Sequence, residues 1–101
     1  MRKAARIDGN QVEIVAALRR AGCTVTSLSS LGNGVPDILV GRHGVNYLLE
    51  IKDGSKPPSR QRLTDMEAQW LEAWRGSASV VNSVEAALAA VGVIPIRGAI
   101  G

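Results

Sequence analysis

Apolar residues recur along the chain at two spacings, and each spacing predicts one kind of element. From about Gln11 to Ala21 they recur every three or four positions, as in a helix that buries one side. Asn10 is a suitable N-cap for this helix, and Gly22 is a suitable stop. Residues 24–28 are rich in β-branched side chains and predict the first strand.

The most apolar stretch predicts two further strands joined by a tight turn. Residues 34–40 and 47–52 are rich in Val, Ile and Leu. Residues 41–46 between them carry Gly, Asn and charged side chains, as hairpin connections do. We therefore expect an antiparallel pair whose turn occupies residues 42–45.

Charged side chains interrupt this hairpin where strand geometry brings them together. The expected register pairs Leu39 with Leu48 and Asp37 with Glu50, and Lys52 lies on the same face one pleat away. Two neighbouring carboxylates repel each other unless a cation lies between them, and Mg²⁺ is often held by one or two carboxylates. The hairpin thus predicts a divalent-metal site. Taken one at a time, these residues are more often a turn cap and the solvent face of an edge strand.

The second half predicts a loop, a helix, a strand and a last helix. Their expected bounds are a loop over 53–63, a helix over 65–75, a strand over 78–81 and a helix that starts at Asn82-x-x-Glu85 and ends near Val91. Thr64 and Glu67 form a capping box for the second helix, whose buried side should hold Met66, Trp70 and Ala73 or Trp74. The order αβββαβα predicts a mixed sheet flanked by helices, because a strand–helix–strand crossover makes the last strand parallel to its neighbour.

Composition limits the class of protein. The 101 residues form one domain, residues 1–101, with a basic arm at 1–7 and an apolar tail at 92–101. The single cysteine, Cys23, is expected to be buried, and it excludes an intramolecular disulfide. No apolar run is long enough to span a membrane and no signal peptide is evident, so we expect a cytoplasmic protein. The net charge is +3, and nine of the 12 basic residues are Arg, which suits phosphate contacts.

Pro36-Asp37 followed by Glu50-Ile51-Lys52 resembles the signature of the PD-(D/E)XK nuclease superfamily. Gly-x-Gly-x-Pro-Asp at 32–37, Glu-Ile-Lys-Asp-Gly at 50–54 and Leu-Thr-x-x-Glu at 63–67 resemble the small stand-alone VRR-NUC-type domains of phage genomes, over residues 8–91. The resemblance implies an α/β (α+β mixed) fold with a restriction-endonuclease-like αβββαβ core. It also implies an endonuclease that uses Mg²⁺ or Mn²⁺ to cleave DNA, leaving 5′-phosphate and 3′-hydroxyl ends.

Further expectations concern the partners. Small relatives of this type act as homodimers on branched DNA such as Holliday junctions, in the cytoplasm of a bacterial host. Two sites related by a two-fold axis suit paired nicks in a symmetric junction. The apolar tail, Trp70 and Trp74 are candidates for the dimer interface.

Phosphodiester hydrolysis needs a metal ion and a group that orients the attacking water. We expect Asp37 and Glu50 to be catalytic residues that bind the metal, and the resemblance adds the backbone carbonyl of Ile51. Lys52 would orient the water and stabilise the charge of the transition state. Glu13 borders the buried face of the first helix, and the resemblance implies a catalytic Glu there that reaches the metal directly or through water. The alternative for Glu13 is a capping box with Asn10.

Other polar residues have supporting roles in this hypothesis. Related sequences often carry a Gln at the start of the second helix, where this chain has Glu67, so we expect Glu67 to be a helix cap and Gln69 to be a supporting candidate. Phosphate contacts are expected from Lys56, Arg60 and Arg62 in the loop and from Arg42 at the hairpin tip, while His43 is solvated. No zinc finger, recognition helix or aromatic stacking platform is evident, so the shape of the DNA should determine binding.

Two other functions fit the same residues. The chain could be a non-catalytic DNA-binding or scaffolding module that keeps a nuclease fold. It could also be a nuclease subunit that needs a partner protein to choose its substrate. Clustered carboxylates favour the enzyme, because a site without catalytic activity has no physical reason to keep them together.

Overall fold

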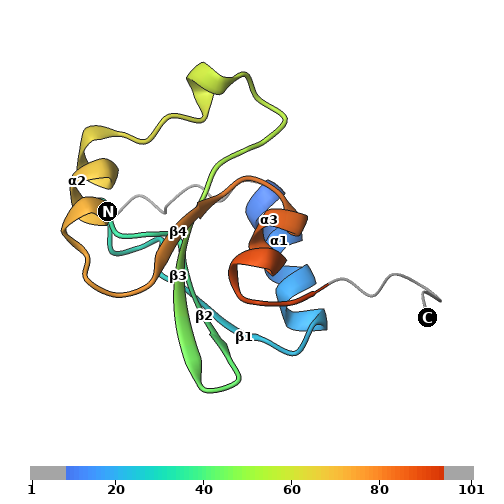
Figure 1. Ribbon diagram of the computed structural model, residues 1–101. Helices are drawn as coiled ribbons and strands as arrows, with labels where there is room; N and C mark the ends of the chain where they lie inside the picture. The colour runs from blue at the N-terminus through green and yellow to red at the C-terminus, as the bar shows by residue number, and fades with distance from the viewer. Residues whose placement is uncertain (1–8, 95–101) are drawn as a thin grey trace.

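The computed structural model describes residues 9–94, and it is a mixed α/β fold with one four-stranded sheet and three helices (Figure 1). The elements are α1 (Gly9–Arg20), β1 (Thr24–Ser27), β2 (Ile38–Arg42), β3 (Val45–Ile51), the 3₁₀ turn η1 (Pro58–Arg60), α2 (Asp65–Ala73), β4 (Ala78–Val81) and α3 (Val84–Ala90). The predicted order αβββαβα is therefore confirmed. The basic arm and residues 95–101 of the apolar tail lie outside the described residues. Within the described part of the chain, no helix is long and apolar enough to cross a membrane.

The strand pairing confirms the predicted hairpin. The sheet order is β1-β2-β3-β4, with antiparallel pairs except for the parallel pair of β3 and β4. Leu39 pairs with Leu48, as the alternation of side chains predicts. At the turn, His43 and Gly44 both have positive φ, at 50° and 78°. Two such residues match the twist of an antiparallel hairpin, and they fix the register of both strands.

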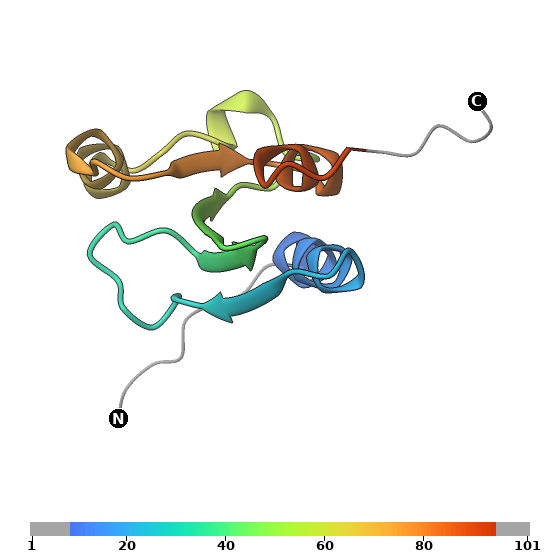
Figure 2. The same cartoon turned by 60° about the horizontal axis from the view of Figure 1, so that its bottom comes forward.

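One face of the sheet carries the hydrophobic core. Helices α1 and α3 lie side by side on this face (Figures 1 and 2). Ile14 and Leu18 of α1 are fully buried, together with Ile38 of β2 and Leu49 of β3. Cys23 belongs to the same cluster and is buried, as predicted. Since alternate residues point to opposite faces, Glu50 and Lys52 must face away from this core.

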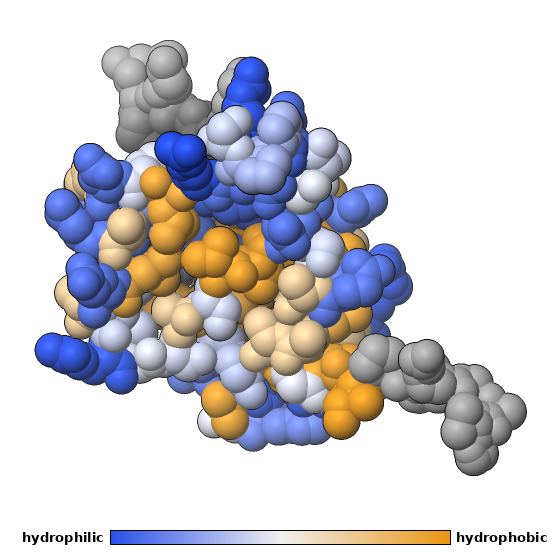
Figure 3. Space-filling view, turned by 45° about the horizontal axis from the view of Figure 1, so that its top comes forward, coloured by the Kyte–Doolittle hydropathy of each residue, from blue (hydrophilic) through white to orange (hydrophobic). Residues whose placement is uncertain are grey.

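Helix α2 lies across the sheet from α1 and α3 (Figure 1), and it contributes no buried residue. The predicted buried side of this helix is therefore wrong. Met66 is 53% exposed and Trp74 is 45% exposed, Ala73 is also exposed, and Trp70 is half-buried. The helix ends at Ala73, earlier than predicted. The apolar side of α2 is not covered by the core. Figure 3 shows hydrophobic residues at the surface on one side of the molecule.

Three details of the predicted element ends are also wrong. Asn10 is inside α1 and does not cap it, because its side-chain amide donates a 2.7 Å hydrogen bond to the carbonyl of Lys52. Ser83, not Asn82, caps α3 by accepting a bond from the N–H of Ala86. The loop after β3 contains η1, because prolines suit the first turn of a short helix.

Candidate functional site

The hairpin brings the two acidic residues of the predicted site together. Ile38 pairs with Leu49, so Asp37 stands next to Glu50 where β2 begins and β3 ends. Asp37 Oδ2 accepts a 2.7 Å hydrogen bond from the backbone N–H of Ile51. Glu50 is only 3% exposed although it carries a carboxylate. The backbone N–H of Ile51 thus positions the Asp37 carboxyl group, and the buried end of β3 positions the Glu50 carboxyl group.

Lys52 completes the cluster with a residue from α2. Its Nζ donates a 2.8 Å hydrogen bond to Glu67 Oε1 and lies 3.4 Å from Glu50 Oε2. Glu67 Oε1 also accepts the backbone N–H of Thr64 at 2.9 Å, and Thr64 Oγ1 accepts the N–H of Glu67. The predicted capping box is therefore confirmed. The same oxygen caps the helix and binds the lysine, so the cap fixes α2 against the end of β3.

Gly34 allows α2 to come this close. It precedes β2 with a φ of +82°, and a Cβ at this position would overlap the backbone carbonyl of Met66. Gly32 has a φ of +63°, but a Cβ there would meet no atom within 4 Å. Both glycines are turn residues, and no helix N-terminus follows them that could bind phosphate. Of Gly32 and Gly34, only Gly34 is required by packing.

Replacing Gly34 with Ala should therefore destabilise the protein by more than about 2 kcal/mol, because the left-handed backbone costs about 1–2 kcal/mol and the clash with Met66 adds to it. Gly32→Ala is the matched control and should cost only the backbone part. Urea unfolding of both variants measures the difference. Equal losses of stability would show that the contact between Gly34 and α2 does not matter.

The cluster shifts the pKa values of its members in opposite directions. Burial away from water, with the nearby charges of Asp37 and Glu67, raises the pKa of Glu50 to about 8. Burial also raises the pKa of Asp37, despite the hydrogen bond from Ile51. Desolvation opposes the charge on Glu67, but its bonds from Lys52 and Thr64 outweigh this and lower its pKa. Desolvation likewise opposes the charge on Lys52, but Glu67 and Glu50 raise its pKa.

The donor chemistry of the cluster suits a hard divalent cation. Asp37, Glu50 and Glu67 bring three carboxyl groups against the single ammonium of Lys52. Mg²⁺ needs one or two carboxylates and completes its shell with water and phosphate oxygens. Within residues 9–94, no three His, Cys, Asp or Glu side chains are arranged as ligands of one ion. With two protein carboxylates in place of three, the residues fit a metal that the Asp37 and Glu50 pair holds and that takes its other ligands from water and substrate.

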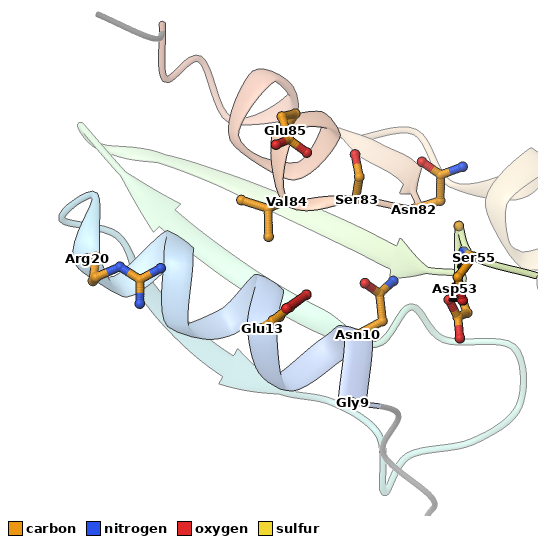
Figure 4. Close-up of a pocket in the computed structure, with 11 residues that line it drawn as sticks. Gly9, Asn10, Glu13, Arg20, Asp53, Ser55, Asn82, Ser83, Val84 and Glu85 are labelled. Carbon is orange, nitrogen blue, oxygen red and sulfur yellow. Dashed lines mark hydrogen bonds between the residues drawn. The ribbon is translucent and has the colours of Figure 1, made fainter.

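Glu13 is not brought to this cluster. It is exposed on α1, which packs on the opposite face of the sheet from Glu50 and Lys52. Instead it lines an open groove of about 980 Å³ between α1 and α3, with Asn10, Arg20 and Glu85 (Figure 4). Its alternative role in a capping box with Asn10 is wrong, because Asn10 is not the cap. The catalytic role of Glu13 stays a prediction that this arrangement does not favour.

The predicted phosphate contacts separate into two groups. Lys56 and Arg60 line a cavity of about 360 Å³ together with Ile51 and Lys52, directly beside the cluster. Arg62 is exposed in the same loop. The fourth predicted contact, Arg42, lies elsewhere. Arg42 donates a 3.1 Å hydrogen bond to the carbonyl of Val91, at the end of β2 remote from Asp37, and His43 is exposed beside it.

Two features were missed in the sequence. Glu67 was assigned a capping role alone, whereas it also binds Lys52. Trp70 and Trp74 stack with ring centroids 4.6 Å apart and planes 16° apart, a pairing that the sequence analysis does not predict. Their spacing of four residues, from inside α2 to its C-cap, was the available signal, since residues at this spacing are neighbours on one side of a helix. Gln69 lines a small pocket with Trp70, and within residues 9–94 its side chain forms no hydrogen bond with the cluster.

Comparisons with family models, with curated proteins and with solved structures found no match to this chain.

Proposed function

We propose that this protein is a metal-dependent DNA endonuclease of the PD-(D/E)XK type, with the core of a VRR-NUC-like domain. One observation carries the proposal. Asp37, Glu50 and Lys52 converge on the outer face of the sheet, where β2 begins and β3 ends, with the ammonium 3.4 Å from a buried carboxylate. A buried cluster of acids costs stability, and shifted pKa values of this kind gather at functional sites, which favours a role for the cluster in binding a cation or in a reaction.

Each residue then has a chemical role. Asp37 and Glu50 would hold Mg²⁺ or Mn²⁺, with the Ile51 carbonyl as a further ligand. The bound metal would polarise the phosphodiester and lower the pKa of a water molecule. Lys52 stays protonated, and its ammonium would stabilise the charge that develops on the phosphate. Glu67 holds the Lys52 side chain in place through the 2.8 Å bond.

The substrate strand would approach along the loop that follows β3. Lys56 and Arg60 share a cavity with Lys52, so a phosphate bound there lies next to the reacting groups. Contacts of this kind position a strand without reading its sequence. We extend the proposal to branched DNA and to a homodimer, which the resemblance implies. Exposed apolar side chains such as Val80, at 46%, offer surface for a second copy.

A specific observation also favours a second candidate, a DNA-binding module without activity. Lys52 already neutralises part of the cluster, and among residues 9–94 no full set of three metal ligands is formed. In that case the basic loop would bind DNA, and the cluster would only join α2 to the sheet. A measurement of metal binding distinguishes the two candidates, because a DNA-binding module without activity is not expected to bind a metal ion.

Cleavage of a labelled DNA set tests the proposal. The set contains a four-way junction, a flap, a nicked duplex, a linear duplex and a single strand, each with Mg²⁺, Mn²⁺ or EDTA. We expect metal-dependent cleavage that Asp37→Asn abolishes, because this change removes the ligand charge and keeps a side chain of the same size. Paired symmetric cuts in the junction would identify a resolvase. No cleavage, with no calorimetric binding of metal, would favour the module.

A further inference from the structure

Helix α2 carries a small pocket that the proposed reaction does not use. Asn33, Met66, Gln69 and Trp70 line this pocket of about 240 Å³. Its size is below that of most sites for drug-sized ligands, so it suits one flat ring system. The lining combines an aromatic ring, a thioether and two amides. This mixture offers both a stacking surface and hydrogen-bonding groups.

The aromatic part of this surface is preformed. Trp70 and Trp74 stack on each other at 4.6 Å, and Trp74 is 45% exposed. A stacked pair of this kind loses little side-chain freedom when another ring joins it, because its rotamers are already fixed. Proteins that bind unpaired nucleic acid strands use aromatic side chains in this way, and each stacked base contributes about 1–3 kcal/mol.

The amides supply the polar part. Asn and Gln pair with base edges through one donor and one acceptor. Within residues 9–94, neither the Asn33 nor the Gln69 side chain forms a hydrogen bond to another protein group, and both residues are exposed. Asn33 also has a φ of 56°, which Asn tolerates better than most residues. Both amides are therefore available to a ligand.

The position of the pocket connects it to the acidic cluster. Gln69 and Trp70 lie within one turn of Glu67, about 5 Å along the helix axis, and Glu67 binds Lys52 directly. Gly34 packs against Met66 and so fixes the loop that carries Asn33 beside the same helix. The pocket and the contact with Lys52 therefore belong to the same short helix.

We propose that the pocket of Asn33, Met66, Gln69 and Trp70 binds one unpaired nucleobase, so that the protein selects DNA that offers an unstacked base. This inference rests on the proposed function for its DNA substrate. It deepens that function, since unpaired bases occur at branches and flaps and are absent from a perfect duplex. A second copy of the chain on the same tryptophans is the competing occupant.

Tryptophan fluorescence tests the inference directly, because both tryptophans of the chain, Trp70 and Trp74, lie at this surface. The probes are a thymidine oligonucleotide and an abasic oligonucleotide of equal length, titrated with EDTA present so that no cleavage occurs. We expect the thymidine strand to quench the fluorescence and to bind roughly tenfold more tightly than the abasic strand. Equal affinity for the two strands would overturn the proposal.

Matched variants show which residues cause the difference in affinity between the thymidine strand and the abasic strand. Gln69→Ala and Asn33→Gly should reduce the ratio of the two affinities toward one, and Asn33→Gly keeps the left-handed backbone without strain. Lys56→Ala with Arg60→Ala should weaken both strands equally and leave the ratio unchanged, because these residues meet phosphate. Trp74→Phe retains a ring and leaves Trp70 as the sole reporter. An unchanged ratio in Gln69→Ala and Asn33→Gly would contradict the assignment.

The affinity and cleavage measurements together distinguish a failure of base binding at the pocket from a failure of the proposed nuclease activity. A base-dependent ratio with no cleavage activity would support the pocket and reject the enzyme. Cleavage with equal affinity for both strands would support the enzyme and reject the pocket. Sedimentation gives the remaining outcome: a dimer whose tryptophans are not quenched by the thymidine strand would assign this surface to a second copy and overturn the proposal.

Discussion

Lys52→Met should reduce DNA cleavage by about a hundred- to a thousandfold, the cost of removing one preorganised donor from a transition state. The methionine keeps most of the apolar length of the side chain and removes only the ammonium. In the folded protein this ammonium is fixed by Glu67 at 2.8 Å and by Glu50 at 3.4 Å. The preformed geometry is the reason for the large expected effect. Single-turnover cleavage with saturating metal measures it.

Glu67→Gln is the matched control for this prediction. Gln serves in a capping box as Glu does, so α2 should keep its first turn. The amide oxygen can still accept a hydrogen bond from Lys52, but it lacks the charge that raises the pKa of that ammonium. We expect a loss of activity smaller than that of Lys52→Met, with circular dichroism unchanged in both variants. Wild-type cleavage by Lys52→Met would exclude Lys52 from the reaction.

The parts of the fold that the sequence predicted depend on local periodicity. Alternation along 38–42 and 45–51 with two turn residues, His43 and Gly44, defines one register, and a slip by one residue would turn Leu49 and Ile51 to solvent. The meeting of Asp37 and Glu50 follows from that register. Neither conclusion needs knowledge of the distant parts of the chain.

The predictions that were wrong concern α2, whose packing depends on the path of the long loop that precedes it. The loop over 53–63 separates α2 from β3, and its path decides which side of α2 meets the sheet. Only the first turn of α2 makes close contact there, through Gly34 and Lys52, so its apolar side stays open. Periodicity shows that Trp70 and Trp74 share a face, but not what that face meets. For the same reason, the sequence could not assign Glu67 to the cluster in place of Glu13.

Without metal, the protein should lose stability as the pH rises from about 4.5 to about 8. The pKa of Glu50 is 4.5 in the unfolded chain and about 8 in the folded one, so between these values the folded state holds a proton that the unfolded state has lost. Folding then binds protons, and stability falls with increasing pH. The raised pKa of Asp37 acts in the same direction. At about 1.4 kcal/mol per pKa unit, the loss is on the order of 5 kcal/mol, or more than about 20 °C in melting temperature for a domain of this size.

The Glu50→Gln variant and the addition of metal test this pH dependence of stability most directly. Glu50→Gln cannot ionise, so in EDTA its stability should change far less over the same pH range, and at pH 8 it should exceed that of the unaltered protein. Mg²⁺ or Mn²⁺ binds the ionised carboxylates, so it should stabilise the unaltered protein more at pH 8 than at pH 6 and should have little effect on Glu50→Gln. Thermal unfolding at the two pH values measures all of these. A metal-free protein that is equally stable at pH 6 and pH 8 would mean that Glu50 is not buried among acids, and the cluster would then lack the charge imbalance that makes it a metal site.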